Sequence, residues 1–366
     1  MDSIIYKKIT YRELKGTNPI AGLDDRYGIG AFVVNNIRRC FLNSPNIVPD
    51  ATAAILAIDQ DIIVGRHVLY GTRINLDGVN INAFSTGSTE VHISQRGKGI
   101  GSRINRLTLD DKDYPMYLFS LVTPAYISIL SKKENKCTIF NIPQLVKIHN
   151  VKYTFQCRGI SGKLLSVCTA VGNGLLWLYN FKNRSRLKQL KKTYNIKRLT
   201  KVPEWAGDMC TKNTFKYFEY HNSEWLQWNL DNNLSGIPRD IQSFYAIYRE
   251  NVPVGFFMTK ERVRTDVPNC RNMICGTVCE WATTDDHLTE ADINVLSIPT
   301  FSNECYHILT VTNDNVTYRN LRKLGFISYG NLQMGFQDKG LLDKYPDMAD
   351  INNWRIRFGC CNSMLY

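Results

Sequence analysis

The stretch Glu90-Val-His-Ile-Ser-Gln-Arg-Gly-Lys-Gly-Ile-Gly-Ser-Arg-Ile104 joins an alternating, strand-like run to a glycine loop and then to an amphipathic helical pattern. Gly97, Gly99 and Gly101 remove side chains from a sharp turn, so successive backbone N–H groups can face one hollow. The turn precedes a helix expected over residues 100–109, whose N-terminus carries partial positive charge and favours an anion. The stretch therefore predicts a phosphate-binding loop between a strand and a helix.

The spacing of the glycines excludes two common phosphate motifs. A Walker loop requires Gly-x-x-x-x-Gly-Lys-Ser/Thr, but Lys98 lies between two glycines with no Ser or Thr after it. A dinucleotide fingerprint requires Gly-x-Gly-x-x-Gly, and its third glycine is replaced here by Ser102 or Ile104, depending on where the count begins. The phosphate ligand is therefore neither a nucleoside triphosphate in a Walker loop nor a dinucleotide.

The loop does match the spacing Arg-x-x-Gly-x-Gly, with Arg96, Gly99 and Gly101 at the specified positions. This pattern resembles the acyl-CoA pyrophosphate loop of the GNAT superfamily of N-acetyltransferases. The resemblance implies that acetyl-CoA or another acyl-CoA is the co-substrate and that its diphosphate rests on the loop. The residues implied as its contacts are Val91, Arg96, Gly97, Lys98, Gly99, Ile100, Gly101 and Ser102.

Candidate catalytic residues lie on the strand before the loop and on a later helix. Acyl transfer to an amine needs a bound thioester, a deprotonated amine and help for the departing thiolate. Glu90 and His92 share one face of the strand, and Val91 points to the other. Glu90 is the candidate general base, His92 is the second candidate, and Tyr126 is the candidate acid for the thiolate. The structural alternatives are a solvated Glu90, a hydrogen-bonded His92 and a Tyr126 packed in the core.

Hydrophobic periodicity predicts an α/β (α+β) fold around the loop. The pattern indicates a helix over 30–42, a hairpin of strands 53–57 and 62–69, strands over 80–84 and 89–93, and, after the loop, elements over 116–122, 124–133 and 138–146. This order resembles one complete GNAT domain. The second half has the same outline, and its Lys-Leu-Gly-Phe326 is similar to the family's late helix.

We therefore expect two GNAT-like domains, each a mixed, mostly antiparallel sheet flanked by helices. The expected boundaries are an N-terminal domain with the acyl-CoA loop over 1–150, a basic helical linker over 151–203 and a degenerate C-terminal domain over 204–366. At the junction equivalent to the first loop, the second half has Trp281-Ala-Thr-Thr-Asp-Asp-His287, whose carboxylates would repel a diphosphate. The second domain is therefore expected to shape the acceptor pocket.

The positive charge of the chain is concentrated in its middle. The net charge is +12, yet residues 135–203 contain no Asp or Glu and supply fourteen Lys and Arg residues, which leaves about −2 for the rest. Within this region, residues 164–181 form an uncharged run of 18 residues. A helix packed between two domains is the first interpretation; a helix resting on an anionic membrane surface and a short membrane span are the alternatives.

The remaining composition favours a cytoplasmic protein without a metal. The first residues lack an apolar core with a cleavage site, so no export signal is expected. The eleven cysteines show no Cys-x-x-Cys pair and are expected to be reduced, and the histidines lack metal-ligand spacing. We expect an acyl-CoA-dependent N-acyltransferase acting on a small, sugar or peptide-like amine, with an anionic membrane surface as a further partner.

Two other classes of function remain open for this sequence. Aminoacyl-tRNA-dependent transferases also resemble paired GNAT domains, and the basic middle would suit nucleic acid, although nucleic acid is not the expected partner. The other alternative is a non-catalytic protein at a membrane surface. Acyl-chain length and oligomeric state cannot be read from the sequence.

Overall fold

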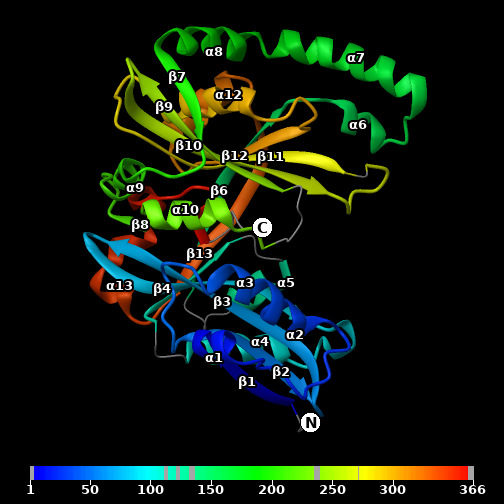
Figure 1. Ribbon diagram of the computed structural model, residues 1–366, viewed down its shortest axis with the longest axis vertical. Coiled ribbons are helices and arrows are strands. Elements are labelled where there is room, and N and C mark those ends of the chain that lie inside the picture. Colours follow the sequence, from blue (N-terminus) through cyan, green and yellow to red (C-terminus); the bar gives the residue numbers. More distant parts are fainter. Residues whose placement is uncertain are drawn as a thin grey trace.

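The computed structural model describes residues 4–110, 114–120, 124–131, 137–234, 240–270 and 272–361. Within them the strands form one continuous 14-stranded sheet, in which β1-β2-β3-β4-β5-β13-β6-β12-β11-β10-β9-β7 is the main order. β8 adds to the edge of β3 and also pairs with β14. The earlier part of the chain occupies the lower portion of Figure 1 and most of the later part occupies the upper portion.

The first half of the sheet is a meander followed by a parallel strand. Its strands are β1 (Ile4–Thr10), β2 (Thr52–Asp59), β3 (Ile62–Leu76), β4 (Val79–Val91) and β5 (Met116–Ser120). Gln60 and Asp61 both have positive φ, 47° and 68°, as expected for the tight turn of a two-residue hairpin. The hairpin predicted from the sequence is therefore confirmed, and β2, which is buried along nearly all its length, lies inside the sheet.

Helices cover both faces of this half. α1 (Tyr11–Gly16) and the helical segment α2 (Ile29–Phe32), η1 (Val33–Ile37) and α3 (Arg38–Phe41) pack on one face. On the other face α4 (Ile100–Leu109) buries Ile100 and Ile104 against β2 and β3. The helix predicted over 100–109 has the predicted bounds, whereas the described part of the next helix, α5, is Pro124–Leu130.

The two strands predicted over 80–84 and 89–93 are one strand, β4. β4 continues through residues 85–88 with a bulge: Val68 pairs with Gly87 and Arg66 pairs with Glu90, so Ser88 and Thr89 lie opposite His67. Ser88 has φ +47°, the backbone strain expected at such a bulge. The end of the strand predicted over 116–122 lies partly outside the described residues.

The second half repeats this plan. Its strands are β7 (Tyr194–Leu199), β9 (Ile241–Arg249), β10 (Val252–Arg264), β11 (Met273–Thr283) and β12 (His307–Val311), and β9 and β10 are joined by a turn with positive φ at Glu250 and Asn251. The shorter elements are β8 (Tyr217–Glu219), β14 (Trp354–Arg355), α9 (Glu204–Thr211), α10 (Ser223–Asp231), α11 (Glu290–Ser297), α12 (Asn315–Lys323), α13 (Leu341–Lys344), η4 (Ile298–Thr300), η5 (Pro346–Ala349) and η6 (Ile351–Asn353).

The two halves exchange their last strands. β6 (Cys137–Ile148), which follows the elements of the first half, pairs with β12 of the second half, with Leu309 opposite Val146. β13 (Ile327–Asp338) returns in the opposite sense and pairs with β5, with Met334 opposite Ser120. β6 and β13 also pair with each other, so the backbone ladder crosses the junction without interruption.

A bent arm of two helices runs along one edge of the molecule. α6 (Lys152–Gln156) leads into α7 (Gly162–Tyr179), and α8 (Phe181–Thr193) follows after a bend of 64° (Figure 1). The interpretation of 164–181 as a helix packed between two domains is wrong, because none of the side chains of α7 is buried. Among the described residues no single helix has the length and composition of a membrane span; only the bent α7–α8 pair does.

Candidate functional site

The glycine loop forms an open hollow at the N-terminus of α4. β4 ends at Val91, a short turn η2 (Ile93–Gln95) follows, and Gly99 then caps α4 in the left-handed conformation at φ +78°. Gly97 is also left-handed, at φ +83°, and a Cβ added to either glycine would meet nothing within 4 Å among the described residues. No described side chain caps α4, so the N–H groups of its first turn stay available to a ligand.

The side chains of the predicted cofactor contacts bond within the loop or pack beneath it, whereas backbone N–H groups at the start of α4 remain open to a ligand. The Nε of Arg96 donates to the carbonyl oxygen of Val91 at 3.1 Å, and the Nζ of Lys98 donates to the Oε1 of Gln95 at 2.7 Å. The side chain of Ile100 is buried and anchors α4. The first-turn amides of α4, at Ile100, Gly101 and Ser102, have no side-chain cap, and their predicted contact with a phosphate stays a prediction.

The strand before the loop pairs with its parallel neighbour over a short stretch of the described residues. β4 and β5 run parallel and pair only where residues 84–86 meet residues 117–119. Over residues 87–91, β4 has no pairing with the described part of β5.

Glu90 and His92 lie toward the segment that contains α2. A carboxylate oxygen of Glu90 lies 2.6 Å from the Nη2 of Arg66, with Glu90 half exposed and Arg66 nearly buried. The guanidinium of Arg66 stands over the ring of Phe32, 4.2 Å from its centroid. The ring of His92 stacks on Tyr27 at 3.6 Å between centroids. The structure thus brings the two candidates to one side, each with a protein partner.

Tyr126 lies on the opposite face of the sheet from Glu90. Its hydroxyl donates to the Oδ1 of Asn105 on α4 at 3.0 Å, and burial raises the pKa of Tyr126 above its usual value. Its ring lies 6.3 Å from that of His67 on β3. Because Arg66 and His67 are adjacent on one strand, they point to opposite faces, so Glu90 and Tyr126 flank β4 from different sides.

His67 is a candidate functional residue that the sequence analysis did not identify. It is buried, its Nδ1 lies 2.7 Å from the hydroxyl of Thr89 at the β4 bulge, and its Nε2 has no hydrogen-bond partner among the described residues. Burial lowers the pKa of His67 to about 4, so the ring is neutral at pH 7. The only signal in the sequence was a histidine within an apolar strand, a pattern that is usually structural.

The equivalent junction of the second half is closed. Asp285 accepts hydrogen bonds from the hydroxyl of Tyr194 at 3.1 Å and from the Nη1 of Arg249 at 3.3 Å. α11, the helix that follows, is capped by Thr289, which forms a capping box with Asp292. In the second half, side chains of the protein therefore bond the groups at the strand-to-helix junction. The corresponding groups at the N-terminus of α4 in the first half stay open to a ligand.

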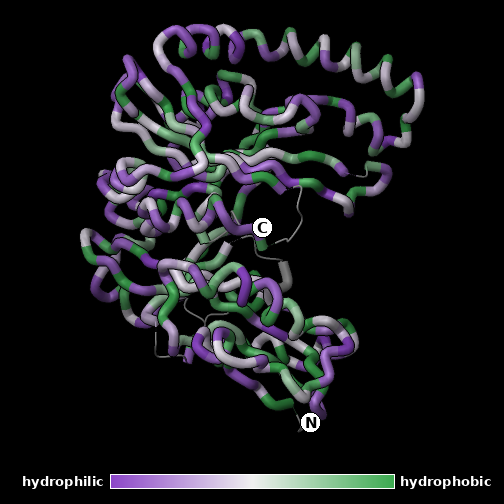
Figure 2. Tube along the Cα trace, in the orientation of Figure 1, coloured by the Kyte–Doolittle hydropathy of each residue, from purple (hydrophilic) through white to green (hydrophobic). Residues whose placement is uncertain are grey.

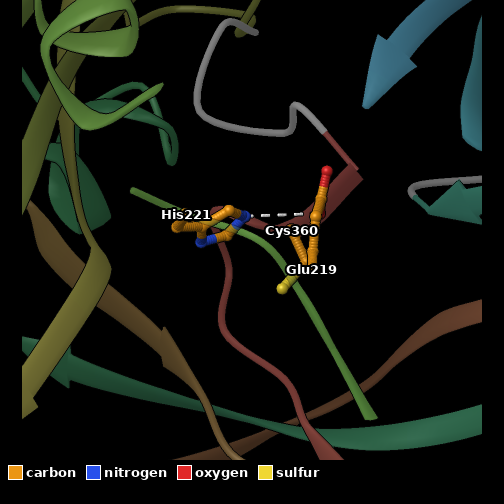
Figure 3. Close-up of side chains that lie close together, drawn as sticks. All are labelled: Glu219, His221 and Cys360. Atoms are coloured by element: carbon orange, nitrogen blue, oxygen red, sulfur yellow. Dashed lines mark ion pairs between the residues drawn. The ribbon is translucent and has the colours of Figure 1, made fainter. Parts of the chain in front are cut away.

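A buried charge cluster lies near the junction of the halves. The side chains of Glu219, His221 and Cys360 converge there (Figure 3). The Nδ1 of His221 lies 2.5 Å from Glu280, which also pairs with Arg355 at 2.6 Å. Although burial lowers the pKa of His221, its contacts with the two carboxylates outweigh burial and raise it.

The cluster is an ion network, in which the Nε2 of His221 lies 3.5 Å from a carboxylate oxygen of Glu219 without forming a hydrogen bond among the described residues. Both nitrogens of His221 face carboxylates, and Glu219 also accepts from the backbone N–H of Cys361 at 2.6 Å. Burial raises the pKa of the Cys360 thiol, which disfavours the thiolate that a metal would require. We assign no ion to these groups, and the expectation that the chain holds no metal stays a prediction.

A cavity of about 450 Å³ opens at the end of β11. It is lined by residues of opposite charge, Lys212, Glu290, Arg355 and Arg357 among them, and by the rings of Trp205 and Trp281. The guanidinium of Arg357 lies 4.5 Å from the centroid of Trp281 and also pairs with Glu290. The pocket thus belongs to the second half, where the sequence analysis placed the acceptor.

No protein-family model and no curated protein matches this sequence. Solved structures do match, and they share with this chain the fold of GCN5-related N-acetyltransferases (the GNAT fold), in two GNAT-like halves. A GCN5-related N-acetyltransferase from Anabaena variabilis matches with a TM-score of 0.51 at 9% identity, covering 91% of this chain and 72% of its own.

The particular arrangement resembles that of N-myristoyltransferase. The Saccharomyces cerevisiae enzyme with bound myristoyl-CoA matches with a TM-score of 0.55 at 12% identity, covering 92% of this chain and 83% of its own. A probable N-acyltransferase from Enterococcus faecalis matches at 0.52 and 11% identity, over 92% of this chain and 73% of its own. At such identities the likeness establishes the fold of the chain.

Proposed function

We propose that this protein transfers an acyl group from a CoA thioester to an amine. The observation that carries the proposal is the uncapped N-terminus of α4 behind the left-handed Gly97 and Gly99, directly after β4 within a GNAT fold. Matching structures are named as N-myristoyltransferase, N-acetyltransferase or probable N-acyltransferase, and several of them hold myristoyl-CoA. The closed junction before α11 supports a single acyl-CoA site in the first half.

The residues have distinct roles in this proposal. The amides of Gly97–Ser102 would hold the diphosphate, and the backbone of β4 beside Val91 would align the pantetheine arm. Glu90 is proposed to accept the proton of the amine, with His92 as the second candidate. Tyr126, whose high pKa keeps its hydroxyl protonated, would protonate the departing thiolate.

Acyl-CoA binding can be tested without knowing the acceptor. Acetyl-CoA in hundredfold excess over its dissociation constant should stabilise the folded protein by about 2.7 kcal/mol and raise its Tm measurably. Pantetheine alone, which lacks the diphosphate, is the control and should have little effect. If no CoA thioester raises the Tm while the protein is folded, the proposed function is wrong.

The acyl chain is proposed to be acetyl, and a longer chain is the second candidate because a structural neighbour holds myristoyl-CoA. A titration series from acetyl-CoA to myristoyl-CoA separates the two. Equal stabilisation by all chain lengths would show that only the nucleotide and diphosphate are recognised. Stabilisation that grows with each methylene would indicate an apolar channel for the chain.

Glu90→Gln should lower kcat by roughly 10²- to 10⁴-fold, the range for a lost general base, and should leave acyl-CoA binding intact. The measurement is the release of free CoA thiol in the presence of a panel of amines. Glu304→Gln, at an exposed site in the second half, is the matched control and should keep full activity. An unchanged kcat for Glu90→Gln would exclude the assignment and leave His92 as the candidate base.

The domain, partner and compartment assignments complete the proposal. Residues 1–150 would bind the donor, 204–366 would shape the acceptor pocket, and 151–203 would connect them. We propose a cytoplasmic protein whose partners are a CoA thioester and a small amine-bearing acceptor, with an anionic membrane surface as a separate partner. An aminoacyl-tRNA-dependent reaction is the alternative, and steep salt-dependent RNA binding without affinity for CoA would favour it.

A further inference from the structure

α7 has two distinct faces. Its inner face lies against α6: the Oδ1 of Asn173 accepts a hydrogen bond from the backbone N–H of Val151 at 3.0 Å, and a Cβ at Gly172 would stand only 2.7 Å from Val151. Its outer face is a stripe of exposed apolar side chains at helical spacing. The stripe consists of Leu164, Val167, Val171, Leu175 and Leu178, each at least 60% exposed.

The apolar surface continues around the end of α7. Trp177 is 57%, Tyr179 57% and Phe181 66% exposed. Lys163 is the only charged residue of α7. Soluble proteins seldom expose so many large apolar side chains in one contiguous patch, and such patches usually mark an interaction surface. The stripe on α7 is therefore expected to be covered in the functional protein.

α8 presents positive charge next to this stripe. Its exposed residues include Lys182, Lys188, Lys191 and Lys192, and no acidic residue occurs in either helix. The guanidinium of Arg184 lies 3.4 Å from the ring centroid of Trp177, which links the two helices across the bend. Figure 2 shows the change from an apolar α7 to a hydrophilic α8 along one edge of the molecule.

The arm is held to the body by specific contacts. Arg186 forms a bidentate pair with Asp292 of α11, at 2.7 and 2.8 Å, and α8 buries Asn183 and Leu190. Lys147 of β6 lies 5.9 Å from the ring of Tyr179. The inner contacts fix which side of each helix faces outward, so the apolar stripe and the basic helix are presented together.

We propose that the α7–α8 arm docks the protein on an anionic membrane, with the outer stripe of α7 among the acyl chains and the lysines of α8 against acidic headgroups. The positive charge of α8 favours a membrane over a second copy of the protein as the surface that covers the arm. A second copy would bring a like-charged α8 to the contact, whereas an anionic bilayer offers both an apolar interior and negative charge. The proposal does not depend on the acyl transfer reaction.

The test is flotation of the full-length protein with vesicles. The protein should float with vesicles of phosphatidylcholine and phosphatidylserine, much less with phosphatidylcholine alone, and less as salt is raised. Val171→Ser and Leu175→Ser should each weaken partitioning about tenfold, the cost of one lost apolar anchor. Lys188→Gln and Lys192→Gln should each weaken it about fivefold.

Matched substitutions on α12 control for loss of apolar surface and charge. Val316 is 58% exposed and Lys323 is exposed, so Val316→Ser and Lys323→Gln make the same chemical changes away from the arm. Both variants should float like the unmodified protein. The arm variants alter exposed side chains, and an unchanged Tm should show that they fold normally. Equal partitioning of arm and control variants would overturn the proposal.

Trp177 supplies an independent readout. It is exposed, whereas the other tryptophans are half-buried or buried, so brominated lipids should quench Trp177 selectively. The quenching should vanish in Trp177→Phe. If the protein instead forms a concentration-dependent dimer that Leu175→Ser abolishes, without binding vesicles, the stripe is a contact between copies and the membrane proposal is wrong. Binding to RNA without binding to vesicles would also overturn it.

Discussion

Gly99→Val should weaken acyl-CoA binding roughly hundredfold or more and abolish the thermal stabilisation by acetyl-CoA. Gly99 has φ +78°, and an added side chain would project into the open hollow where the phosphate groups are proposed to lie. Loss of two charge-assisted N–H bonds, at about 1.5 kcal/mol or more each, accounts for that factor. Isothermal titration with CoA measures the affinity directly.

The control for Gly99→Val is Gly78→Val. Gly78 also has a left-handed backbone, at φ +89°, with nothing near its missing Cβ, but it lies in the turn between β3 and β4 at the other end of those strands. Each valine should cost about 1–2 kcal/mol of folding free energy through backbone strain. Only Gly99→Val should also remove CoA affinity; equal affinities in the two variants would contradict the phosphate loop.

Glu280→Gln should destabilise the fold by about 3–5 kcal/mol, the range for removing one partner of a buried ion pair. Glu280 is fully buried between Arg355 and His221, at 2.6 and 2.5 Å. The substitution leaves both cations buried without their shared carboxylate. Urea unfolding of both proteins measures the difference, and Glu304→Gln, which changes an exposed carboxylate, should leave stability unchanged.

The same variant should have an altered pH dependence of stability. Burial raises the pKa of Glu280, but Arg355 and His221 outweigh it and hold the pKa at about 2. A depressed pKa in the folded state adds stability above the unfolded value near 4.5, and this stability is lost as the pH falls towards 2. Glu280→Gln should lack this acid-dependent loss. A difference in unfolding free energy that is constant across this range would contradict the assignment.

His221 contributes in the opposite direction. Its pKa is raised above 6.5 in the folded protein, so its stabilisation is full below that value and declines as the pH rises through the folded pKa. Glu219 and Glu280 are the carboxylates that hold its proton. The cluster therefore contributes most to stability between the acid range in which Glu280 is protonated and the range above pH 6.5 in which His221 loses its proton.

The sequence pattern predicted those elements of the first half whose structure depends on residues close together in the chain. The alternation before Gly97, the glycines and the helical spacing after Ile100 determine a strand, a turn and a helix within a few residues of chain. The tight turn at Gln60 and Asp61 is likewise a local feature. These elements carry the proposed donor site, which is why the sequence alone indicated it, although the roles of Glu90, His92 and Tyr126 stay predictions.

Features that depend on distant packing could not be predicted. An uncharged run such as 164–181 suggests burial, and only the tertiary structure shows that its outer face is exposed. His67 lies beside Tyr126 of α5, which comes much later in the chain, and the Glu219–His221–Glu280–Arg355 network joins residues far apart in the chain. The continuity of β4 depends on its pairing with β3, which the local sequence does not show.

The exchange of β6 and β13 constrains how the chain can be completed during synthesis. The edge of β5 meets its partner strand only after β13 has left the ribosome, because Ser120 pairs with Met334. Until then the growing N-terminal part carries an unpaired strand edge, which can form non-native pairings with other chains. The two halves must therefore finish folding together, and neither can be separated from the other as an autonomous unit with a complete sheet.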